Sequence, residues 1–147
     1  MNIDINTLKN IADYAVIGIL LFMNFLVIWF WIERLMFYKK VNLSTYKSKE
    51  QLEIDLTNNL TVISTVGSNA PYIGLLGTVI GIIITFYIIG ESGNLDAKVI
   101  MKSLALALKA TALGLVVAIP ATFFYNHLAR KVEVLLTKWD ILQNKGN

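Results

Sequence analysis

Three long apolar runs, separated by polar segments, dominate this chain of 147 residues. They cover residues 14–32, 72–90 and 104–126. The middle run of 19 residues has no formal charge, and as an α-helix it would be roughly 28 Å long, close to the hydrocarbon thickness of a bilayer. The pattern therefore predicts an all-α membrane protein with three transmembrane helices.

The segments between the runs are too fragmented to bury a second core, so we expect residues 1–147 to form a single membrane domain. Residues 33–70 are expected to form a connecting loop, with helical extensions next to the spans and a short connector at 42–59 that holds a helical turn. Residues 91–96 are expected to form a short turn on the opposite side. Residues 127–147 are expected to continue the third helix, with an apolar seam made of Leu128, Val132, Leu135, Trp139 and Leu142. The spacing of this seam favours packing against a neighbouring helix over a surface helix lying on the bilayer.

The composition excludes a soluble globular protein. Hydrophobic residues make up 56% of the chain and charged residues only 16%, whereas soluble domains carry about a quarter charged residues. There is no cysteine, which excludes disulfides and thiolate metal sites, and we expect neither a metal nor another cofactor. Asp4, Lys9 and Asp13 precede the first run and do not form the basic leader of a secretory signal, so we expect a retained helix.

The distribution of lysine and arginine predicts the orientation in the membrane. Nine of the 13 basic residues lie in the 33–70 segment and in the tail after the third run, and three lie on the opposite side. The positive-inside rule then places the N-terminus outside and the C-terminus inside. The net charge of +3 is thus a topology signal, and without a basic, aromatic-rich face outside the membrane we expect no nucleic-acid partner.

Small and hydroxylated residues form matching stripes on the second and third helices. The second helix carries Gly74, Thr78, Gly81 and Thr85. The third carries Ala107, Thr111, Gly114, Ala118 and Thr122. Successive members are three or four residues apart, so each stripe lies on one helical face. Because small residues let helix backbones approach, we assign to helix packing Gly74, Gly77, Gly81, Gly114, Ala118 and Pro120, the last of which should also bend its helix.

Thr78 and Thr111 are the candidate pore-lining residues of a proton pathway. Each lies toward the middle of its span, and a hydroxyl can both donate a hydrogen bond to a carboxylate and accept one from a carboxylic acid. The secondary candidates are Thr85, Lys109 and Thr122. Lys109 is the one ionisable group within the predicted spans, and it would act either as a snorkelling lipid anchor or as one half of an ion pair.

The predicted spans contain no aspartate or glutamate, so a proton pathway would need a carboxylate from a partner subunit. His127 falls at the inner end of the third helix, where we expect an interfacial residue. Enzymatic activity is not expected. An intramembrane enzyme could use only an arrangement such as Ser103 with Lys109, which lie on different faces of the helix.

Two ordered motifs carry a resemblance to a known family. The first is NAPYIGLLGTVIGI at residues 69–82, and the second is ALKATALGLVVAIPA at residues 107–121, followed by Tyr125 and Asn126. From Asn69 to Arg130 the chain strongly resembles the ExbB/TolQ/MotA proton-channel family, and within it the ExbB branch. Chance is a poor explanation for such motifs on two consecutive spans, whereas a lone GxxxG would be a weak signal.

The resemblance implies a homopentamer in the bacterial inner membrane, with a periplasmic N-terminus, a cytoplasmic C-terminus and surrounding lipid. The second and third helices, extended into the cytoplasm, would line the pore of this ring. An ExbD-like single-span protein in the pore would supply a proton-carrying aspartate, and a TonB-like protein would use the work for outer-membrane transport of iron complexes and vitamin B12. Thr78 and Thr111 match the pore threonines. The chain departs from well-known members at Leu106, where they carry a glutamate, and at Lys109, where they are apolar.

Two other functions remain open. A TolQ-like subunit of the Tol system, which serves envelope integrity, would share these motifs. A passive membrane scaffold would also use small-residue stripes, but its threonines could be replaced without functional loss. A flagellar stator is not expected, because MotA-type members have a fourth span and a large cytoplasmic domain.

Overall fold

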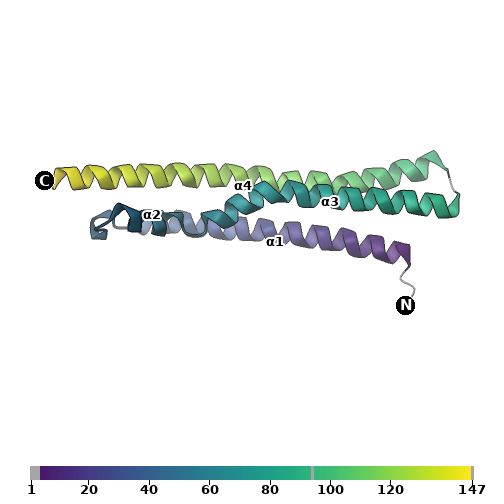
Figure 1. Cartoon of the computed structure of the whole chain (residues 1–147), viewed down its shortest axis with the longest axis horizontal. Coiled ribbons are helices and arrows are strands. Elements are labelled where there is room, and N and C mark those ends of the chain that lie inside the picture. The colour runs from purple at the N-terminus through teal and green to yellow at the C-terminus, as the bar shows by residue number, and fades with distance from the viewer. Residues whose placement is uncertain (1–3, 94, 147) are drawn as a thin grey trace.

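The computed structural model describes residues 4–93 and 95–146. In chain order its helices are α1 (Ile5–Lys40), the 3-10 helix η1 (Leu43–Thr45), α2 (Lys49–Thr57), α3 (Leu60–Ser92) and α4 (Ala97–Lys145). Figure 1 shows α1, α3 and α4 lying lengthwise beside one another, with α3 and α4 as an antiparallel hairpin. The turn of this hairpin lies at the same end as the N-terminus, and α2 lies near the other end.

Three helices, α1, α3 and α4, are each long and apolar enough to cross a membrane, by length and composition. The prediction of an all-α protein with three membrane helices is therefore confirmed. The helices extend beyond the three apolar runs, since α1 continues to Lys40 and α3 already begins at Leu60. The membrane boundaries within the helices, and the orientation of the chain, stay predictions.

Much of the segment 33–70, expected to be a loop, is helical. The short helix α2 begins where the Ser48 side chain accepts a hydrogen bond from the backbone N–H of Gln51, at 3.2 Å. Leu52 and Leu56 from α2 are fully buried against the rest of the bundle. This tertiary packing stabilises the helix, although its sequence is mostly polar. Asn59, with a left-handed φ of 69°, then turns the chain into α3.

Two side chains of α1 hold the C-terminal end of α2. Arg34 donates a hydrogen bond from Nη1 to the carbonyl oxygen of Asp55 at 2.7 Å, and Tyr38 donates its hydroxyl to the carbonyl oxygen of Leu56 at 2.7 Å. The last carbonyls of a helix have no partner within it, so these bonds satisfy groups that would otherwise be buried unpaired. Arg34 is only 3% exposed and is also paired with Glu33.

The C-terminal half of α4 packs on α1, η1 and α2 through the predicted apolar seam, at the end of the bundle that is named the inner end after the predicted orientation. Leu128 and Val132 are buried, and Leu135 and Trp139 are half-buried against the core, which confirms the seam as an inter-helix contact. Trp139 also donates its indole N–H to the carbonyl oxygen of Tyr46 at 3.1 Å. Leu142 is 48% exposed, so the extension of the seam to this residue is wrong.

Candidate functional site: a threonine pair between α3 and α4

Glycines bring the backbones of α3 and α4 into direct contact. A Cβ atom placed on Gly74 would lie 2.5 Å from the carbonyl oxygen of Ala110 and 3.0 Å from the Cα of Gly114. A Cβ atom on Gly114 would lie 2.6 Å from the carbonyl oxygen of Ala70. Real Cβ atoms do not approach backbone atoms this closely, so any side chain at either glycine would push the helices apart.

The contact continues toward the hairpin turn at Gly77 and Gly81. A Cβ atom on Gly77 would lie 2.9 Å from the Cβ of Ala110 and 3.0 Å from a methyl carbon of Val16, so α1 joins the two helices here. A Cβ atom on Gly81 would lie 2.9 Å from the Cβ of Ala107. On α4, Ala118 is buried, whereas Pro120 is exposed within the helix. The bend expected at Pro120 stays a prediction.

Thr78 and Thr111 meet at this contact. Thr78 is only 4% exposed, and its hydroxyl oxygen lies 2.5 Å from that of Thr111. The same oxygen lies 2.9 Å from the carbonyl oxygen of Ala107 and 3.3 Å from that of Gly74. Thr111 is half-buried, so it is the member of the pair that remains partly accessible.

Either hydroxyl could donate in the bond between Thr78 and Thr111, and the neighbouring carbonyl oxygens favour one direction. A carbonyl oxygen only accepts, and the hydroxyl of Thr78 has one proton, which the shorter distance assigns to Ala107. Thr78 then accepts its bond from the hydroxyl of Thr111. In this arrangement the oxygen of Thr111 keeps lone pairs that the pair itself does not use, and because Thr111 is half-buried it can act as an acceptor.

The secondary threonines lie in different surroundings. Thr85 is 4% exposed and donates to the carbonyl oxygen of Gly81 in its own helix at 2.8 Å. Its hydroxyl proton is therefore used within α3. Thr122 lies opposite Gly67, where an added Cβ atom would approach its hydroxyl oxygen to 2.9 Å, so it belongs to the same helix contact nearer the inner end.

Lys109 lies apart from the threonine pair, as its predicted position on the helix required. It lines a cavity of about 220 Å³ between α1 and α4 together with Asn10 and Asp13. The sequence did not predict that Asp13 and Lys109 line the same cavity, because the relative register of α1 and α4 is set by packing. His127 is exposed and lines a surface cavity with the basic residues Lys39, Arg130, Lys131 and Lys138.

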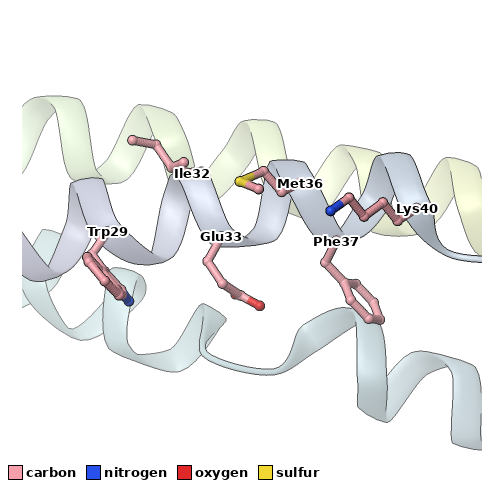
Figure 2. Close-up of a pocket in the computed structure, with 6 residues that line it drawn as sticks. All are labelled: Trp29, Ile32, Glu33, Met36, Phe37 and Lys40. Carbon is pink, nitrogen blue, oxygen red and sulfur yellow. The ribbon is translucent and has the colours of Figure 1, made fainter.

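A separate apolar cavity of about 520 Å³ lies along the C-terminal half of α1 (Figure 2). It is lined by Trp29, Ile32, Glu33, Met36, Phe37 and Lys40. In Figure 2 the side chains of Trp29, Glu33 and Phe37 point from α1 toward the ribbon of α2 and α3. All six lining residues come from α1, so this cavity is not part of the threonine site.

Comparison with known proteins agrees with the motifs around this site. The model of the MotA/TolQ/ExbB proton channel family matches residues 31–141. A biopolymer transport protein ExbB from Aquifex aeolicus is 53% identical over 138 residues, covering 94% of this chain and 93% of the relative. A biopolymer transport protein ExbB from Helicobacter pylori strain J99 is 53% identical over 136 residues, covering 92% of this chain and 94% of the relative. The chain therefore belongs to the MotA/TolQ/ExbB proton channel family.

Proposed function

We propose that this chain is the ring-forming subunit of an inner-membrane proton channel, which converts proton flow into mechanical work for transport across the outer membrane. In this proposal the subunits form a homopentamer with α3 and α4 toward a central pore. An ExbD-like single-span partner in the pore carries the proton on an aspartate, and a TonB-like protein receives the work. The names of the relatives support the ExbB role. The hydroxyl pair of Thr78 and Thr111 carries the mechanism.

The direction of the hydrogen bonds determines which form of a carboxyl group the pair would favour. Because Thr111 presents an acceptor, it suits a protonated carboxylic acid, which has a hydroxyl to donate. An ionised carboxylate is costly at membrane depth unless donors or water reach it. The threonine pair would therefore stabilise the neutral, proton-loaded aspartate while it passes through the dry part of the pore.

The same bonds do not form a wire for protons. The chain of donors runs from Thr111 to Thr78 and ends at the carbonyl oxygen of Ala107, which has no proton to pass on. A proton that arrives at Thr111 has no onward path through this subunit. Proton movement would then require movement of the carrier itself, which supports a mechanism in which the partner's aspartate alternates between the outer and inner water.

The two proposed pore-lining helices supply no acid at membrane depth, so in this proposal the acid comes from another chain. On α3 no aspartate or glutamate occurs before Glu91, and on α4 none occurs before Glu133. A single three-helix subunit also cannot enclose a partner helix, so a closed ring is needed. The large apolar side chains exposed on the middle of α4 would contact neighbouring subunits or lipid, and they include Leu108, Leu115, Val116 and Ile119.

Replacing both hydroxyls tests the proposal. In Thr78→Val with Thr111→Val each side chain keeps its branched shape and loses only its hydroxyl, so the helix contact should persist. We expect the subunit to assemble with its single-span partner, measured as the mass of the detergent-extracted complex, and to lose proton-dependent uptake. Thr111→Val alone should be more severe than Thr78→Val alone, because Thr111 is the partly accessible member of the pair and Thr78 is buried.

Thr85→Val is the matched control. This threonine is as buried as Thr78, but its hydroxyl bonds only to its own helix, so uptake should be unchanged. Full uptake by an assembled double variant would remove both threonines from the pathway and favour a passive scaffold. Complementation separates the two related systems: rescue of growth on scarce iron indicates the TonB system, and rescue of detergent resistance indicates a TolQ-like role.

A further inference from the structure

The packing of α1 against α3 places Asp13 deeper than the apolar pattern of α1 suggests. Val16 lies directly against Gly77, and Asp13 is one helical turn closer to the N-terminus. Figure 1 shows that α1 and α3 run antiparallel, so a position one turn before Val16 is level with the part of α3 that follows Gly77. About ten uncharged residues of α3 still separate that level from Gly90, roughly 15 Å of helix. Asp13 is thus level with the uncharged run of α3, although its side chain, like that of Lys109, is exposed on the surface of the single chain.

Lys109 occupies the same level on α4. The cavity of about 220 Å³ has Asn10, Asp13 and Tyr14 on its α1 wall. Its α4 wall includes Leu106, Lys109 and Leu113. Asp13 and Lys109 are the only charged side chains among its lining residues. A cavity of this volume also has room for several water molecules beside the two charges.

Both charges lack a close partner in this arrangement. Within the described part of the chain, neither Asp13 nor Lys109 takes part in an ion pair shorter than 4.0 Å. A single uncompensated charge at membrane depth is costly, whereas two opposite charges that face one cavity can neutralise each other. The four-carbon stem of lysine allows the ammonium group to move toward the carboxylate, and Asn10 and Tyr14 offer polar groups to complete the hydrogen bonding.

We propose that Asp13 and Lys109 form an ion pair across this cavity in the membrane, which ties α1 to the α3–α4 hairpin. Lys109 lies two residues before Thr111 and roughly 160° around α4 from it, so the pair is on the side of α4 away from the threonine site. The ion pair therefore holds the outer helix without entering the proposed proton pathway. Its role is to position α1, and this role does not depend on which partner group carries the proton.

A double-mutant cycle tests the coupling without using transport as the readout. Asp13→Asn, Lys109→Met and the combination are purified in lipid nanodiscs, and the midpoint of thermal unfolding is measured. Each single change should lower the midpoint by several degrees, because it leaves one charge unpaired. The combination should recover most of that loss, and the exchanged pair Asp13→Lys with Lys109→Asp should recover part of it. Lys102→Met, which changes a lysine of α4 outside the cavity, is the matched control and should have little effect.

The outcomes discriminate between the pair and a lipid contact. If Lys109 instead binds a lipid phosphate, Lys109→Met will lower the midpoint in nanodiscs with anionic lipid, Asp13→Asn will not, and the exchanged pair will recover nothing. Strictly additive losses in the cycle would also overturn the proposal. If a single variant fails to accumulate, accumulation of the charge-exchanged pair supports the ion pair, and failure of the exchanged pair overturns it.

Discussion

At Gly74 the backbones of α3 and α4 lie so close that no side chain fits between them, whereas around α2 the helices are joined by long side chains that reach across. In the first region the packing surface is the backbone itself, so very little can be changed without moving a helix. In the second region Arg34, Tyr38 and Trp139 each hold a backbone carbonyl of a distant segment. The hydroxyl pair is thus held where two backbones are in contact, whereas the inner end is held by individual hydrogen bonds from side chains.

The largest effect should come from a side chain inserted where α3 and α4 touch at Gly74 and Gly114, which we call the glycine contact. In Gly114→Val the new Cβ atom would lie 2.6 Å from the carbonyl oxygen of Ala70, so α3 and α4 must separate. Because the obstacle is backbone, we expect a cost above the ~1–3 kcal/mol usual for overpacking and loss of the assembled complex. Size-exclusion chromatography of the extracted protein measures this loss.

Gly18→Val supplies the control for this change. An added Cβ atom at Gly18 meets nothing within 4 Å, so the variant should assemble and unfold like the unchanged protein. If Gly114→Val also assembled normally, the close approach of the two helices would be disproved, and with it the geometry that brings Thr78 to Thr111.

A smaller effect should follow from removing the arginine that caps α2. In Arg34→Met the carbonyl of Asp55 loses its partner and Glu33 loses its counter-charge, although Glu33 is 39% exposed and can turn to water. We expect a loss of about 2 kcal/mol, confined to the inner end, because an orphaned buried carbonyl costs about 1–3 kcal/mol. Hydrogen exchange of the α2 amides should accelerate while the glycine contact stays protected.

Arg130→Met is the matched control. Arg130 forms an exposed ion pair with Glu133 on the surface of α4, and such pairs contribute about 0–1 kcal/mol. Equal acceleration of exchange in both variants would show that Arg34 has no special role in holding α2.

The difference between the two regions also explains what the sequence could predict. Glycine and threonine at helical spacing mark one face without knowledge of the partner, so the three helices and the stripe were predictable. The bond of Arg34 joins residues 21 apart and ends on a backbone atom, which no residue pattern identifies. The acceptor role of Thr111 depends on the carbonyl of Ala107, and the depth of Asp13 depends on the register between α1 and α3, both of which are set by packing.

The smallest effect is expected for two tryptophans, one near the boundary between the two regions and one at the inner end. Trp31 stacks on Phe124 with ring centroids 4.2 Å apart, and within the described residues its buried indole N–H has no hydrogen-bond partner. Trp139, farther toward the inner end, donates the same group to Tyr46. Trp31→Phe should therefore leave the thermal midpoint nearly unchanged, because stacking is kept and no bond is lost. Trp139→Phe should cost about 1 kcal/mol, the net contribution of one hydrogen bond. Equal losses in the two variants would mean that ring size, and not the reach of an indole to a distant carbonyl, holds the inner end together.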